Sequence, residues 1–113
     1  MSRRQCISPA IVIALLASLG LTPSASAANC KAGFVPRAAA GADTVCVTPA
    51  SKARVAAENA RAPLLWLSGP FGLKTCALGF VWREAFIGDL ICVTPLIRTA
   101  VRLENDTAAD RQQ

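Results

Sequence analysis

The hydrophobic and polar positions of this chain follow one pattern that occurs twice. Residues 30–59 align with residues 76–105 without a gap, at a spacing of 46, and 14 of the 30 aligned positions are identical. A self-match at a fixed spacing indicates a duplicated structural unit.

In the second copy, residues 79–83 alternate in the manner of a short β-strand, with Phe80 and Trp82 on one face. A turn containing Gly88 follows, and then an apolar, β-branched run at 89–93 that predicts a second strand. The two copies are therefore each expected to contain a β-hairpin. The matching strands of the first copy are expected at residues 32–37 and 43–47.

A helix is predicted after each hairpin. Thr94 is a good N-cap, and Pro95 suits the first helical position because its missing N–H would have no partner there. Apolar residues then recur at helical spacing as far as Asn105, and the first copy predicts a helix from Pro49 to about Arg61. The predicted fold is thus a small α+β protein with two ββα units in tandem.

The N-terminus has the features of a secretory signal peptide. Arg3 and Arg4 precede an apolar run at residues 11–21, and Ala25-Ser26-Ala27 forms a small-x-small cleavage signature. The apolar run is shorter than the roughly 20 residues that span a membrane, although retention as an uncleaved anchor is the alternative. Residues 1–27 are therefore predicted to be removed, leaving a secreted or periplasmic protein with no membrane span.

Removal of this segment also removes Cys6 and leaves an even number of cysteines. An even count in a small exported chain predicts disulfides, and four cysteines allow three pairings. The duplication favours one bridge inside each unit. Zinc sites use shorter cysteine spacings and often histidine, which this chain lacks, so we expect no metal or other cofactor. The expected bridges are Cys30–Cys46 and Cys76–Cys92.

The remaining sequence divides into four parts. Residues 28–62 form the first predicted repeat and 76–105 the second. Residues 63–75 are an apolar connector, expected to pack between the units or, alternatively, to serve as an exposed docking patch. Residues 106–113 are polar and are expected to form a flexible tail.

The second copy resembles a repeat of exported bacterial proteins with the pattern C-x2-GFVWREA-x2-GD-x2-CVTP-x2-R. The resemblance covers residues 76–105 well and 30–59 in a weaker form, and Ile87 and Leu90 depart from the pattern in the second copy. It implies export and a repeated unit but brings no activity with it. In the first copy Pro36, Ala38, Ala42 and Lys52 stand at the positions of Trp82, Glu84, Gly88 and Arg98.

Charge and residue types weigh against several classes of function. Loss of Arg3 and Arg4 lowers the net charge from +5 to +3, and the basic residues are scattered, which does not favour nucleic-acid binding. Without histidine, no serine can form a Ser-His-Asp triad. A small enzyme using the turn carboxylates Glu84 and Asp89 is one alternative, and a disulfide-rich inhibitory or membrane-active peptide is another.

A non-catalytic binding or envelope-associated module is the favoured hypothesis, with a protein or a cell-envelope component as its partner. An aromatic anchor among charges is typical of interface hot spots. The competing interpretation is structural: Trp82 covers the disulfide, and Arg83 pairs with Asp89 across the turn. The candidate binding residues are Trp82, Arg83, Glu84, Asp89 and Arg98.

Overall fold

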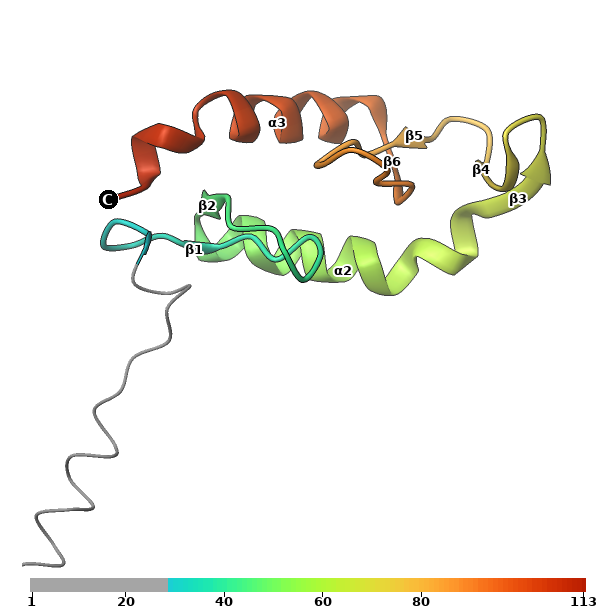
Figure 1. The fold of residues 1–113 in the computed structure, drawn as a ribbon. Coiled ribbons are helices and arrows are strands. Elements are labelled where there is room, and N and C mark those ends of the chain that lie inside the picture. The colour runs from blue at the N-terminus through green and yellow to red at the C-terminus, as the bar shows by residue number, and fades with distance from the viewer. Residues whose placement is uncertain (1–28) are drawn as a thin grey trace, which may run out of the picture.

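A computed structural model describes residues 29–113 of the chain (Figure 1). Two α-helices, α2 and α3, run along two sides of the molecule, and short antiparallel strand pairs occupy the space between them and one end. This confirms a small α+β fold; the predicted signal peptide lies outside the described residues. The elements are β1 (Val35–Pro36), β2 (Cys46–Val47), α2 (Pro49–Leu65), β3 (Trp66–Gly69), β4 (Gly72–Cys76), β5 (Val81–Trp82), β6 (Cys92–Val93), α3 (Pro95–Asp106) and the 3-10 helix η2 (Ala108–Arg111).

Both predicted disulfides are confirmed. Cys30 and Cys46 are bonded with their Cα atoms 5.7 Å apart, and Cys76 and Cys92 with their Cα atoms 5.6 Å apart. Each bridge holds one end of a hairpin, β1–β2 or β5–β6, in which two residues of each strand pair. The strands are shorter than the sequence predicted because backbone pairing stops where the turns begin.

Both helices begin where the Thr-Pro pairs predict. The Thr48 side chain accepts a hydrogen bond from the Ser51 amide, and the Thr94 side chain accepts one from the Ile97 amide. These bonds satisfy backbone donors that the first helical turn leaves free. Helix α2 continues four residues beyond its predicted end, with Pro63 inside its last turn.

The connector forms a hairpin of its own. Strands β3 and β4 pair from Trp66↔Cys76 to Gly69↔Gly72, and the Ala77 amide donates to the Leu65 carbonyl at 2.9 Å. The connector therefore leaves the body of the molecule and returns to its starting point. None of the helices within residues 29–113 is long and apolar enough to cross a membrane.

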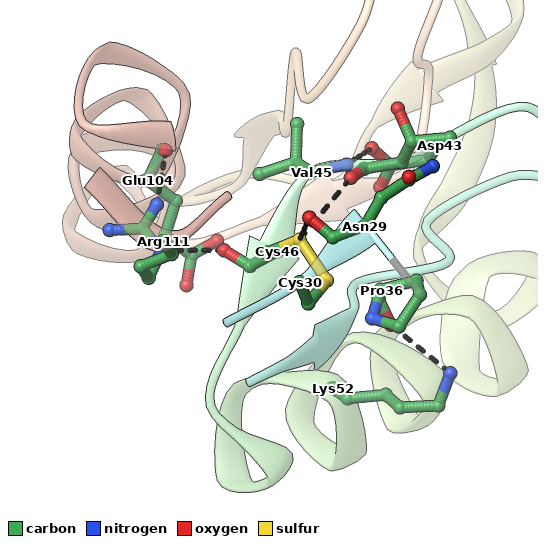
Figure 2. Close-up of a disulfide and its surroundings, with 10 residues drawn as sticks. Asn29, Cys30, Pro36, Asp43, Val45, Cys46, Lys52, Glu104 and Arg111 are labelled. Carbon is green, nitrogen blue, oxygen red and sulfur yellow. Dashed lines mark hydrogen bonds between the residues drawn. A yellow bond between two sulfur atoms is a disulfide. The ribbon is translucent and has the colours of Figure 1, made fainter. Parts of the chain in front are cut away.

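The C-terminal segment, expected from its polarity to be a flexible tail, adopts defined structure. The Lys31 amide donates to the Arg111 carbonyl at 2.9 Å, and Cys30 pairs with Gln112 in an isolated β-bridge. The Arg111 guanidinium donates to the carbonyls of Cys46 and Glu104 beside the first disulfide (Figure 2). These contacts tie the last residues to the β1–β2 hairpin.

The apolar core is small. Its central cluster consists of Ala39, Val55, Ala85 and Val101, with Ile97 packed against it, and Val47, Val93, Ala62 and the disulfide cysteines Cys30, Cys46 and Cys92 are also buried. The four residues of the central cluster form two pairs at the 46-residue spacing, so corresponding positions of the two halves meet at the centre. Such a core buries little apolar area, and polar interactions accompany it.

Arg37, in the first hairpin, connects the two halves. Its guanidinium is buried and donates to both carboxylate oxygens of Asp43, at 2.8 and 3.2 Å, within the same hairpin. Its remaining nitrogen donates to the side chain of Asn105 in α3 at 2.9 Å. The first hairpin therefore bonds to the helix of the second half.

Arg83 makes the corresponding contacts from the second hairpin to the helix of the first half. It donates to both oxygens of Asp89, at 2.8 and 3.2 Å, and reaches Asn59 at 3.0 Å and Glu58 at 3.2 Å in α2. Each hairpin thus supplies an arginine to the helix of the other half. The two helices receive these arginines through the same Glu-Asn pair, at 58–59 in α2 and 104–105 in α3.

The ion pairs of Arg54 have no counterpart at the 46-residue spacing. Arg54 donates to Glu58 at 3.0 Å and to Glu104 at 3.2 Å, so it bridges the two helices, whereas Ala100 stands at the matching position of α3. Burial lowers the pKa of Arg54, but the bonds to Glu104 and Glu58 outweigh burial and raise it. One cation is therefore shared by two glutamates.

Candidate binding site at the Trp82 end

The turn between β5 and β6 is organised by Asp89. Its carboxylate accepts hydrogen bonds from the amides of Ala85 at 2.9 Å and Ile91 at 3.3 Å, as well as from Arg83. The backbone of Glu84 has a φ of 58° and that of Gly88 a φ of 87°, so this turn needs left-handed conformations at both positions. Asp89 therefore positions the turn, and its oxygens are occupied by that task.

The first hairpin has the same construction around Asp43. Its carboxylate accepts from the amides of Ala39 at 2.9 Å and Val45 at 3.2 Å. Burial raises the pKa of Asp43, but the Arg37 bond and the two amides outweigh burial and hold the pKa below its usual range. The ionised form is the one that the fold stabilises.

The predicted binding residues separate into two groups in the structure. Arg83 and Asp89 are 0% and 3% exposed and face the interior, where they join the two halves. Trp82, Glu84 and Arg98 lie at the surface of the second half. The Arg83–Asp89 pair across the turn, anticipated as a structural alternative, is formed and is buried.

Trp82 lies where the connector hairpin meets the second disulfide. It pairs across the ladder with Cys92, and its indole N–H donates to the Lys74 carbonyl of β4 at 2.9 Å. The Phe71 ring meets the Trp82 ring edge-on, with centroids 5.7 Å apart and an interplanar angle of 69°. The connector hairpin is thereby joined to β5 by a hydrogen bond from β4 and an aromatic contact from the β3–β4 turn.

A pocket of about 280 Å³ opens beside this aromatic pair. It is mostly apolar, with the second disulfide at its wall and Arg98 at its edge. Arg98 donates to Glu84 at 2.8 Å, and both side chains are partly exposed, at 34% and 54%. The pocket therefore combines an aromatic interior with a charged rim. Its principal lining residues are Phe71, Cys76, Phe80, Val81, Trp82 and Arg98.

The first half does not reproduce this pocket. Pro36 stands where Trp82 does, and its carbonyl accepts a bond from Lys52 at 3.2 Å (Figure 2). A larger cavity, of about 420 Å³, lies near the first turn, but small side chains such as Ala40 and Ala42 line much of it. We place the candidate site at Trp82 because aromatic and charged groups converge there.

Sequence reasoning missed the contribution of the connector. Phe71, at the tip of the β3–β4 hairpin, completes the pocket, and Trp66 fixes the hairpin by donating its indole N–H to the Leu90 carbonyl at 2.7 Å. Lys74 lies over the Trp66 ring at 4.4 Å, a cation–π contact. The apolar character of the connector was the available signal, but it did not indicate which residues would meet Trp82.

All four cysteines within residues 29–113 are in disulfides, and in this range no group of three or more His, Cys, Asp or Glu side chains is placed so that it could hold a metal ion. Comparison of the chain with models of protein families, with curated proteins and with solved structures found no significant match.

Proposed function

We propose that the chain is an exported, non-catalytic binding module, and that the Trp82 pocket is its binding site. The observation that carries the proposal is the aromatic pocket with its charged rim, which the second half has and the first half lacks. A discrete concave site with few polar groups is the usual form of a binding site.

The same proposal includes the architecture: two copies of one ββα unit, paired through their hairpins and helices. Identical residues make the corresponding contacts, Arg37 with Asn105 and Arg83 with Asn59. The sequence match at a spacing of 46 supports the same interpretation. In this arrangement the first unit supports the second, which carries the site.

Export is supported by the covalent framework. Two disulfides in a domain of this size are typical of secreted or periplasmic proteins, because the cytosol keeps thiols reduced. The signal-like sequence at residues 1–27 agrees with that location.

The contacts of the carboxylates support a binding role over the enzyme alternative. Asp89 is buried and its oxygens accept bonds from Arg83 and two amides, while Glu84 is exposed and paired with Arg98. A general acid or base must present an accessible, unoccupied oxygen to its substrate. Asp89 is buried, and Glu84 is held by its bond to Arg98.

Capture of a partner by the immobilised protein tests the proposal. Wild type, Trp82→Ala and Leu103→Ala would be incubated with secreted and envelope fractions, and bound material identified by mass spectrometry. Leu103 is 61% exposed on α3 and is not among the pocket's lining residues, so it serves as the matched control. We expect a partner retained by wild type and Leu103→Ala but lost by Trp82→Ala; equal capture by all three would argue against the site.

A further inference from the structure

The β3–β4 hairpin exposes apolar side chains that the pocket does not use. Leu67, Phe71 and Leu73 are 55%, 72% and 79% exposed, and Leu64 and Leu78, just outside the hairpin, are 79% and 100% exposed. Of these five, only Phe71 lines the pocket. Exposed apolar side chains grouped in this way mark a contact surface.

The β3–β4 hairpin projects from the molecule and carries Leu67, Phe71 and Leu73, which together form its apolar tip. Leu67 pairs with Thr75, and side chains alternate along a strand, so Leu67 and Leu73 share one face. Trp66 and Lys74 lie on the other face, in contact with each other. Figure 1 shows the hairpin at the end of the molecule remote from the C-terminus. The exposed leucines therefore lie on a protrusion and not in a groove.

The charged residues of this hairpin and of the chain segments that flank it have one sign. Residues 59–83 contain Arg61, Lys74 and Arg83 and no aspartate or glutamate. Arg83 is buried and paired, whereas Arg61 and Lys74 are exposed. The carboxylates that flank this stretch in the sequence, Glu58 and Glu84, are both paired with arginines. The hairpin is thus apolar and carries the exposed cation Lys74, and exposed Arg61 lies five residues before it in the chain.

We infer that this tip inserts into the surface of an anionic lipid membrane. A protruding apolar tip enters the boundary between headgroups and acyl chains, and neighbouring cations are attracted to anionic headgroups. Lys74 has a long stem that lets its charge stay at headgroup level while Leu67 and Leu73 enter the apolar layer. Lipid fits these observations better than a protein partner, because the leucines project without a shaped recess and the exposed charge on the hairpin, Lys74, is cationic.

Vesicle co-sedimentation tests this inference with the oxidised protein recovered after export, its N-terminus defined by mass spectrometry. The vesicles would contain phosphatidylcholine with or without phosphatidylglycerol. We expect wild type to bind the anionic vesicles, and Leu67→Ser/Leu73→Ser to bind them at least tenfold more weakly. Leu103→Ser is the matched control and should bind as wild type does. Lys74→Glu should weaken binding to the anionic vesicles and remove the preference for them.

Absence of wild-type binding, or equal binding by wild type and Leu67→Ser/Leu73→Ser, would overturn the inference. Loss of a captured protein by the double variant, without vesicle binding by wild type, would assign the tip to a protein partner and also overturn it. The double variant leaves Trp82 in place, so failure here is distinguishable from failure of the pocket proposal. Far-UV circular dichroism would verify that each variant is folded.

Discussion

Arg83 of the second hairpin donates to the side chain of Asn59, at the Glu-Asn pair of the first helix, over 3.0 Å. Asn59 in turn donates to the carbonyl of Ala39 in the first hairpin at 3.2 Å. One side-chain amide therefore joins a helix to both hairpins. Asn105 makes the corresponding bonds to Arg37 and to the Ala85 carbonyl.

Arg83→Ala is expected to lower the free energy of unfolding by about 3–5 kcal/mol, because it leaves Asp89 buried without its cation and removes one of the two arginines bonded to Glu58. Urea denaturation measures the change. Arg98→Ala is the matched control, since it removes a partly exposed pair worth about 0–1 kcal/mol. Equal losses in the two variants would contradict the structural role of Arg83.

Arg54 is expected to couple energetically to Glu104. In a double-mutant cycle, Arg54→Ala and Glu104→Gln should together cost less than the sum of the single changes, by about 0.5–1 kcal/mol. The coupling arises because Arg54 bridges the two helices. Additive effects would mean that this ion pair contributes nothing to holding the two helices together.

Acid should weaken the fold partly through Asp43. Because its pKa in the folded protein lies below the ordinary value of 3.8, its contribution is present above pH 3.8 and is lost as pH falls through the folded pKa. Asp43→Asn should therefore be less stable than wild type at pH 7, with a difference that shrinks below pH 3.8. Denaturant midpoints at several pH values test this, and a difference independent of pH would contradict it.

Replacement of Cys76 and Cys92 by serine is expected to cost about 3 kcal/mol, because each bridge closes a loop of about fifteen residues. The Cys30–Cys46 bridge closes a loop of the same length, so the Cys30→Ser/Cys46→Ser variant is the matched comparison. Thermal unfolding gives both values. Peptide mapping without reduction should recover each bridge separately, and a peptide linking Cys46 to Cys76 would contradict this framework.

Local features of the fold could be predicted from the sequence, because their signals lie close together in the chain. The pair of cysteines inside each repeat predicted the bridges, and Thr48-Pro49 and Thr94-Pro95 predicted the helix starts. The Arg83–Asp89 contact across six residues was considered for the same reason.

Long-range contacts could not be predicted in this way. Arg37 meets Asn105 across 68 residues, and nothing near either residue identifies the other as its partner. A signal was present, since the Glu-Asn pair recurs at the same position of both helices, but one sequence could not show what it binds. Phe71 likewise reaches Trp82 only because the connector folds back as a hairpin.

The proposed binding site can be tested most directly by photo-crosslinking from inside the pocket. A benzophenone amino acid would replace Phe71, which contacts Trp82 at the pocket, and in a matched protein would replace Leu103 on α3. After export and irradiation, we predict a specific adduct from position 71, abolished by Trp82→Ala, and none from position 103. The same adduct from both positions, or an adduct from position 71 that persists in Trp82→Ala, would contradict a binding site at Trp82.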